Sequence, residues 1–431
     1  MNSSHLLVER ALTLIPASEE FLPLINAVIG ASRTDREKLW ARSGAYATLS
    51  KRVVDARQLS ALVPGIAQKA QRRIESLFSL VVQAIQEQQA GNAAAAADLL
   101  VSAGEVEEAE RWLDKAQQLY GLALEIAQDL REKGPQILAL RRLGRVARSA
   151  GRLEEAQGYY ERSYRLSVDQ VDVPGQVIAC QGLGNLCDDR GQRALSRYWW
   201  DRGMEIAGSR APELIWPFQI NLAALAVLEG KLDAAEVHLV RARELIEAAE
   251  NGEAMLFWYN NRGLLLQARG DSPRAERVYR EALERSDDPF WQMRIRINLG
   301  QSLIPQGRLF EAEEEARRAE ELAIMNRLIR FLVDVYELLG AVSTARADEE
   351  GFVFYEQALN VCREQGLPPV SEAAVYRGYG LLHRACGRAA EAAAYLEQAR
   401  DTYAALGIAV ERDKVARELQ SVWELPRQGA A

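Results

Sequence analysis

Four arginines in one short segment have the residue type and spacing to bind an anion: Arg141, Arg142, Arg145 and Arg148. Three of them are separated by four and then three residues, so they share one face of a helix. A guanidinium group donates two parallel hydrogen bonds to a carboxylate, so this face can receive a carboxylate or an acidic peptide segment. The alternative is a solvated face balanced by Glu154 and Glu155, because runs of charge usually face water.

Residues for catalysis or metal binding form no comparable pattern. The three histidines, His5, His238 and His383, stand alone, with no pair at a metal-ligating spacing. The four cysteines form no C-x-x-C pair and are expected to be reduced, buried, apolar residues. The sequence contains no glycine-rich phosphate loop. We therefore predict that the protein is not an enzyme and that it holds no metal and no cofactor.

Charge and hydropathy limit the classes of partner. The formal net charge of -8 and the isoelectric point near 5.4 argue against direct nucleic-acid binding, which needs a basic face. The sequence contains no run of 18 apolar residues, the length expected of a membrane span. Glu9 and Arg10 lie where a secretory signal would be apolar. We expect a cytoplasmic protein that does not engage a membrane.

A short sequence motif of constant length recurs along the chain. Its turn glycines are spaced by 37 to 40 residues, apart from a degraded copy around Gly340 and Ala347, and they are Gly151, Gly191, Gly230, Gly270, Gly307 and Gly387. Seven places earlier stands a small residue: Gly144, Gly184, Ala223, Gly263, Gly300, Gly340 and Gly380. Glycine inside a helix costs about 1 kcal/mol relative to alanine. Its recurrence in register predicts a second helix that approaches too closely for a side chain.

Two further features define the repeating unit. A small residue follows most turn glycines by twelve places, as at Ser163, Gly203 and Ala282, and is predicted to be the complementary contact on the second helix. Prolines such as Pro174 and Pro289 precede the turn glycines by 16 to 18 residues, where the first helix should begin. The unit is therefore helix, turn, helix and linker, and stacked copies predict an all-α solenoid.

These residues resemble the tetratricopeptide repeat family. Leu143-Gly144, Gly151, Ala156, Tyr160 and Ser163 follow the order of its motif. The same order recurs in Arg262-Gly263, Gly270, Ala275, Tyr279 and Ala282. The period of about 40 is similar to the long-helix variant of kinesin light chains and bacterial peptide-sensing regulators. The resemblance implies a right-handed superhelix whose first helices line a concave groove.

The chain is expected to fall into four parts. Residues 1–66 lack the repeat motif and are predicted to form a helical cap or small module. A DNA-binding head or an enzymatic site is the less favoured alternative. Residues 67–133 read as an irregular first repeat in which an alanine-rich stretch extends a helix. Residues 134–407 hold seven repeats, and residues 408–431 form a capping helix and tail.

Asparagines occupy one position in three consecutive copies, and the family resemblance implies that this position points into the groove. Asn221, Asn261 and Asn298 each lie two residues before the mid-helix small residue, and Asn185 lies one turn further along in the preceding copy. An asparagine amide offers a donor and an acceptor, which match the backbone of an extended peptide. The family resemblance implies that role. The alternative is a consensus residue kept for helix packing.

Aromatic residues gather near the starts of the middle helices. Most are expected to be core, but Phe257 and Trp258, one turn before Asn261, are candidate exposed anchors of the kind enriched at interfaces. With Arg142, Arg145, Asn185, Asn221, Arg294 and Asn298 they complete the predicted peptide- or protein-binding residues.

We therefore predict an interaction scaffold or adaptor that binds a peptide or protein segment in the concave groove. The alternative is a ligand- or peptide-responsive regulator that sequesters or releases a kinase, transcription factor or effector enzyme. Small rotations between repeats add up in a solenoid, which suits it to such a switch.

Overall fold

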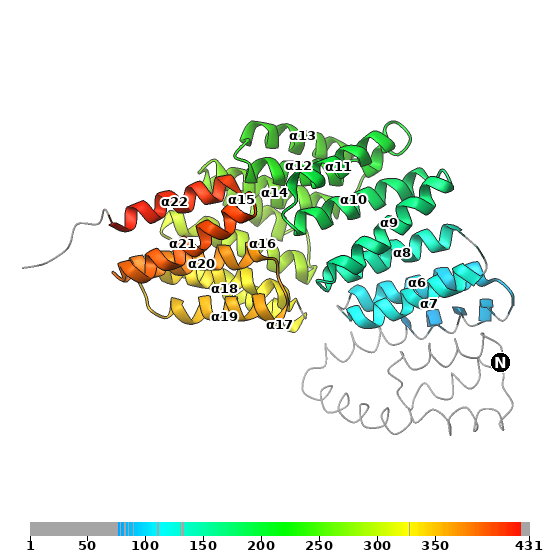
Figure 1. The fold of residues 1–431 in the computed structure, drawn as a ribbon, viewed down its shortest axis with the longest axis horizontal. Helices are drawn as coiled ribbons and strands as arrows, with labels where there is room; N and C mark the ends of the chain where they lie inside the picture. Colours follow the sequence, from blue (N-terminus) through cyan, green and yellow to red (C-terminus); the bar gives the residue numbers. More distant parts are fainter. Residues whose placement is uncertain are drawn as a thin grey trace, which may run out of the picture. The chain divides into compact units, whose positions relative to one another are not determined.

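The structure is a computed structural model that describes residues 76–423, apart from residues 78, 82, 85, 89, 110, 111, 130, 132 and 327. Every regular element in this part of the chain is a helix, as the sequence predicts (Figure 1). The expected cap at residues 1–66 and the tail after Trp423 lie outside the described residues. The chain divides into two compact units, Met1–Gly175 and Gln176–Ala431, which are described separately.

The first unit contains two complete helical hairpins among its described residues. Helix α6 (Ala93–Ala109) pairs with α7 (Leu113–Asp129), and α8 (Lys133–Ser149) pairs with α9 (Leu153–Asp169). Helix α10 (Val173–Asp189) begins in this unit and ends in the next.

The second unit continues the alternation of first and second helices. Short turns join most partners of a hairpin, and in the described residues of this unit three single-turn 3-10 helices precede or follow α-helices. The elements after α10 are α11 (Arg193–Ala207), η1 (Pro212–Leu214), α12 (Trp216–Leu228), α13 (Leu232–Ala248), α14 (Ala254–Ala268), α15 (Ser272–Leu283), α16 (Pro289–Leu303), η2 (Ile304–Gln306), α17 (Leu309–Met325), η3 (Ile329–Phe331), α18 (Leu332–Arg346), α19 (Gly351–Glu364), α20 (Pro369–Ala385), α21 (Ala389–Ala405) and α22 (Ala409–Trp423).

Four of the six mid-helix glycines in the described repeats are required by aromatic rings of the second helices: Gly144, Gly184, Gly263 and Gly340. The other two, Gly300 and Gly380, face the side chains of Leu338 and Leu396. A Cβ atom added to Gly144 would lie 2.8 Å from the Tyr160 ring, and one added to Gly263 would lie 2.2 Å from the Tyr279 ring. The predicted close approach is confirmed, but the nearest atoms belong to the aromatic residue and not to the small residue three places later. At Gly203 the absent side chain instead makes room for Phe218 of the following first helix, 2.4 Å from an added Cβ.

The same arrangement is present in α6 and α7, where the sequence predicts an irregular copy. An added Cβ on Gly104 would lie 2.4 Å from the buried ring of Tyr120. Gly104 precedes Gly144 by one 40-residue period, but arginine stands at position 111, one period before Gly151, and hides the motif. The alanine-rich stretch is itself the first helix of this hairpin.

Helix starts and turns follow local chemistry. Asp288 accepts hydrogen bonds from the backbone N–H groups of Phe290 and Trp291, and Pro289 occupies the first turn of α16, where no N–H donor is needed. Turn glycines such as Gly270 have a left-handed φ of 78°. In the degraded copy Ala347 takes this place with a φ of 54°.

Candidate functional site

In the second unit the first helices form the inner layer of the stack. Helices α12, α14, α16, α18 and α20 each contact the next first helix directly, whereas the second helices between them pack mainly on first helices. We call the side of these helices that faces away from the second helices the groove, after the concave groove that the sequence predicts on the first helices.

Asn221 of α12 is joined to the preceding first helix. Its Nδ2 donates a hydrogen bond of 2.7 Å to Oδ1 of Asn185 in α10, and the same oxygen accepts a bond of 3.2 Å from Trp200 Nε1. The two predicted asparagines are thus brought together, one repeat apart, and held in place by a buried tryptophan.

Asn298 of α16 is joined to α14 by a similar bond, but to a residue that the sequence interpretation missed. Its Nδ2 donates to Oδ1 of Asn260 at 2.7 Å, and its backbone oxygen accepts from Gln267 Nε2 at 3.1 Å. Both asparagines are largely buried, with relative exposures of 7% and 6%. The signal in the sequence was the Asn260-Asn261 pair, of which only the second residue fits the repeat register.

Asn261 makes a different contact. Its Nδ2 donates to the backbone oxygen of Phe257 within the same helix at 2.9 Å. No bond to another repeat accompanies it among the described residues, so Asn261 is oriented by its own helix.

Each asparagine pair has one amide nitrogen and one amide oxygen that make no hydrogen bond with the described residues. In the described part of the chain Asn260 Nδ2 and Asn298 Oδ1 make no hydrogen bond, and neither atom is among the fully buried atoms without a partner. Both atoms therefore reach solvent. The same holds for Asn185 Nδ2 and Asn221 Oδ1, so each pair presents one donor and one acceptor.

A chain of aromatic rings runs across the starts of the same first helices. The Phe257 ring lies 5.5 Å from that of Trp216 in α12 and 4.6 Å from that of Trp291 in α16, and Phe290 continues the chain to Phe331 at 5.4 Å. Phe257 is 39% exposed, whereas Trp291 is buried. Phe257 thus has the exposure and the rigid aromatic support of an interface anchor.

The other candidate anchor, Trp258, is occupied within the fold. Its Nε1 donates to the backbone oxygen of Leu239 at 2.9 Å, and the Arg243 guanidinium lies 5.2 Å from its ring centre. These contacts tie α14 to α13 of the preceding hairpin and direct the side chain toward that helix.

Charged residues also lie on the first helices α16 and α18. Arg294 of α16 forms an ion pair of 3.2 Å with Asp334 of α18. Glu337, one turn after Asp334, makes no ion pair or hydrogen bond with the described residues. Burial raises the pKa of its carboxyl to about 8, Asp334 adds to the shift, and Arg377 opposes it.

The predicted arginines of the first unit are already partly neutralised. Arg142 pairs with Glu105 of α6, and Arg145 bonds Glu108 of the same helix at 2.7 Å. Both acids lie 37 residues before their partners, so they occupy the preceding first helix. Arg142 and Arg145 therefore each tie α8 to α6 by a separate ion pair.

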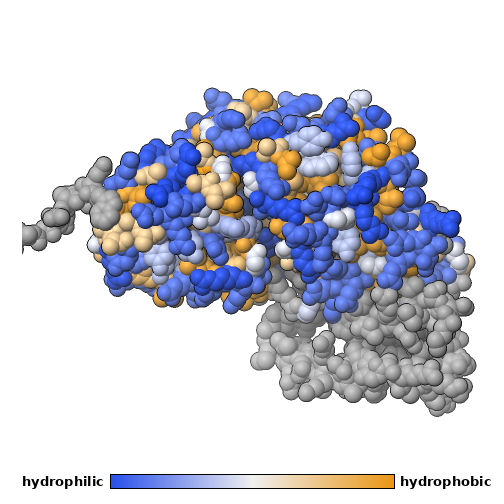
Figure 2. All heavy atoms as spheres, viewed as in Figure 1, coloured by the Kyte–Doolittle hydropathy of each residue, from blue (hydrophilic) through white to orange (hydrophobic). Residues whose placement is uncertain are grey.

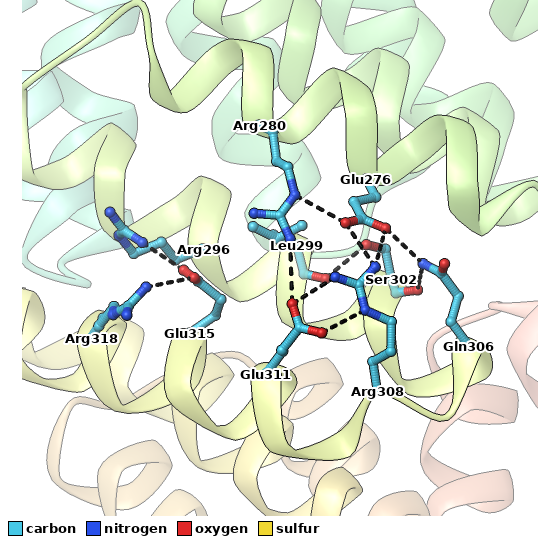
Figure 3. A network of polar contacts seen from close by, with 10 residues as sticks. All are labelled: Glu276, Arg280, Arg296, Leu299, Ser302, Gln306, Arg308, Glu311, Glu315 and Arg318. Atoms are coloured by element: carbon cyan, nitrogen blue, oxygen red, sulfur yellow. Dashed lines mark hydrogen bonds and ion pairs between the residues drawn. The ribbon is translucent and has the colours of Figure 1, made fainter.

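Ion pairs also join second helices outside the groove (Figure 3). Arg308, which precedes α17, donates to both carboxylate oxygens of Glu276 in α15 at 2.9 and 2.7 Å, and Arg280 and Gln306 add further bonds to that carboxylate. Burial alone would raise the pKa of Glu276, but these hydrogen bonds lower it below its ordinary value. Arg308 also bonds Glu311 at 2.6 Å, which closes the network.

On the face drawn in Figure 2 hydrophilic residues predominate, and hydrophobic residues lie in small groups between them. The described residues include no group of three or more His, Cys, Asp or Glu side chains placed to hold a metal ion. None of the described helices is both long and apolar enough to cross a membrane.

Comparison with known proteins agrees with the repeat register. Residues 218–288 match the tetratricopeptide repeat family model, and no curated protein matches the sequence. The apo form of the quorum sensor NprR from B. thuringiensis is 16% identical, with 80% of this chain and 99% of that one covered and a TM-score of 0.53. A Rap protein complexed with Competence and Sporulation Factor is 12% identical over 77% of this chain and 98% of that one, with a TM-score of 0.51. The predicted fold is confirmed, and so is the predicted resemblance to the tetratricopeptide repeat family, whose model matches residues 218–288.

Proposed function

We propose that the protein binds an extended peptide or protein segment along the first helices α10, α12, α14 and α16. The observation that carries the proposal is the pair of inter-repeat amide bridges, Asn185–Asn221 and Asn260–Asn298, each with one donor and one acceptor in reserve. A peptide backbone presents the same two groups at a regular spacing. An amide held by its neighbour binds such a backbone with little loss of side-chain freedom.

Phe257 supplies the apolar part of the proposed site. Its exposed ring lies between the rings of Trp216 and Trp291, so it can be covered by a ligand side chain without moving. Aromatic residues on a rigid support lose little entropy on binding, which makes them effective anchors. The combination favours a ligand with at least one apolar side chain next to an extended backbone.

The comparison structures support a binding function by analogy. The Rap protein of the same fold is complexed with Competence and Sporulation Factor. Fold alone does not define function, so the assignment rests on the amide bridges of this chain. Release of a second partner on ligand binding remains the finer alternative within the same proposal.

The proposal is tested by selecting ligands from a display library of short random peptides on the full chain. A selected peptide is then titrated against Asn221→Ala, Asn298→Ala and their combination. We expect each single change to weaken binding by about five- to tenfold, which corresponds to the loss of roughly one hydrogen bond.

The matched control is Asn326→Ala. Asn326 lies outside the groove at the end of α17 and, like Asn261, donates to a backbone oxygen four residues earlier. The control should bind the peptide as the unchanged protein does. Equal affinity of all variants would exclude the asparagines from the site.

A further inference from the structure

Arg141 is the arginine on α8 that has no acceptor among the described residues. It makes no hydrogen bond and no ion pair there, and its Nε atom is fully buried without a partner. The Nε atoms of Arg142 and Arg148 are also buried without a partner, but each neighbouring guanidinium has a partner for its other nitrogens or for the group as a whole: Arg142 is paired with Glu105, Arg145 with Glu108, and Arg148 is hydrogen-bonded to Tyr160. One guanidinium of a four-arginine cluster is therefore unsatisfied.

The surroundings of Arg141 carry excess positive charge. Two acids, Glu105 and Glu108, face Arg142 and Arg145, and both carboxylates are used by those two arginines. Asp172 interacts electrostatically with Arg141, but its side chain accepts the backbone N–H of Gly175 and forms no ion pair with Arg141. Burial, followed by the charge of Arg142, lowers the pKa of the Arg141 guanidinium.

A half-buried arginine without an acceptor is costly to the fold. Its burial removes water from the guanidinium, and the nearby arginines repel it. An oxyanion would offset both effects by accepting two parallel hydrogen bonds from the guanidinium fork. Arg141 and Arg145 lie one turn apart, so their charges can act on the same anion.

We propose that Arg141, supported by Arg142 and Arg145, binds a carboxylate of an acidic polypeptide segment in the first unit. The planar fork of arginine matches a carboxylate in geometry, and the net charge of this cluster complements an acidic segment. The site lies in the other unit from the asparagine bridges and does not depend on the function proposed for them.

The test is a titration of the full chain with three probes, monitored through the Nε–Hε signals of arginine by NMR. The probes are acetylated and amidated triglutamate, acetylated trialanine with a free C-terminal carboxylate, and inorganic phosphate. We expect triglutamate to shift the Arg141 signal and to bind at least tenfold more weakly to Arg141→Met, which keeps the apolar stem but loses the fork. Arg141→Lys should retain part of the affinity, because it keeps the charge.

Arg165→Met is the matched control, because it removes one exposed arginine of the same unit that is paired with Glu161. It should bind triglutamate like the unchanged protein. Binding of trialanine at the same signal would assign the site to a chain terminus and would still support a carboxylate.

Three results would overturn the proposal: absence of triglutamate binding, equal loss in the control, or binding of phosphate but of neither peptide. The thermal midpoint without probe gives a second reading. A purely structural arginine predicts that Arg141→Met lowers the midpoint, whereas an unsatisfied cation predicts that the midpoint is kept or raised.

Discussion

Substitution of Gly263 by alanine tests the packing rule that sets the repeat. The added Cβ would lie 2.2 Å from two atoms of the Tyr279 ring, whereas real Cβ contacts stay beyond 3.0 Å. The ring cannot retreat, because it is fully buried and its hydroxyl donates to Gln267 at 2.9 Å. Helices α14 and α15 must therefore separate.

The expected magnitude follows from two opposing terms. Overpacking of a tight core costs up to about 3 kcal/mol, and replacing a helical glycine by alanine returns about 1 kcal/mol. We therefore expect Gly263→Ala to lower the free energy of unfolding by about 2 kcal/mol. The assay is urea unfolding followed by the helical circular dichroism signal.

Gly158→Ala in α9 is the control, since an added Cβ there meets no atom within 4 Å. It should raise the free energy of unfolding by about 0.5 to 1 kcal/mol, through helix propensity alone. Combining Gly263→Ala with Tyr279→Leu should recover part of the loss, because the obstructing ring is gone. The packing rule is refuted if Gly263→Ala stabilises the protein as Gly158→Ala does.

Two further predictions concern charged groups. Glu276→Gln should lower the free energy of unfolding at neutral pH by about 1–3 kcal/mol, because it weakens a carboxylate bonded by several donors, while the exposed Glu205→Gln should change it by less than about 0.5 kcal/mol. The pKa of Glu276 is lowered, so its contribution is present above pH 4.5 and disappears as the pH falls through the folded value, which acid titration of the melting temperature would reveal. The contribution of Glu337 to the free energy of unfolding changes with pH in the opposite direction. Its pKa is raised to about 8, so stability falls as the pH rises from 4.5 to 8. Glu337→Gln should therefore raise the free energy of unfolding by roughly 1–3 kcal/mol at pH 9 and leave it unchanged at pH 4; the same gain at both values would contradict this assignment.

The repeat was predictable because it follows from local rules. Turn glycines and small mid-helix residues leave a period in the sequence, and that period predicts alternating first and second helices, which the structure has from α8 to α21. The hairpin of α6 and α7 was harder to see, because arginine at position 111 replaces the turn glycine while Gly104 and Tyr120 keep the packing.

The hydrogen-bond partners of the groove asparagines lie in neighbouring repeats, so a single copy of the motif does not predict them. Asn221 bonds Asn185 at a separation of 36 residues, and Asn298 bonds Asn260 at 38. The rotation of each helix decides which of two adjacent asparagines meets its neighbour, and the period does not fix that rotation. A search for complementary residues one period apart would have found these pairs.

The most direct test of peptide binding in the groove compares a selected peptide with analogues methylated on single backbone nitrogens. If the asparagine bridges hold the backbone, methylation of a contacted nitrogen should weaken binding to the unchanged protein at least tenfold. The same methylation should have little further effect on the variant that combines Asn221→Ala with Asn298→Ala. Equal losses with both proteins, or no loss at any position, would contradict the account.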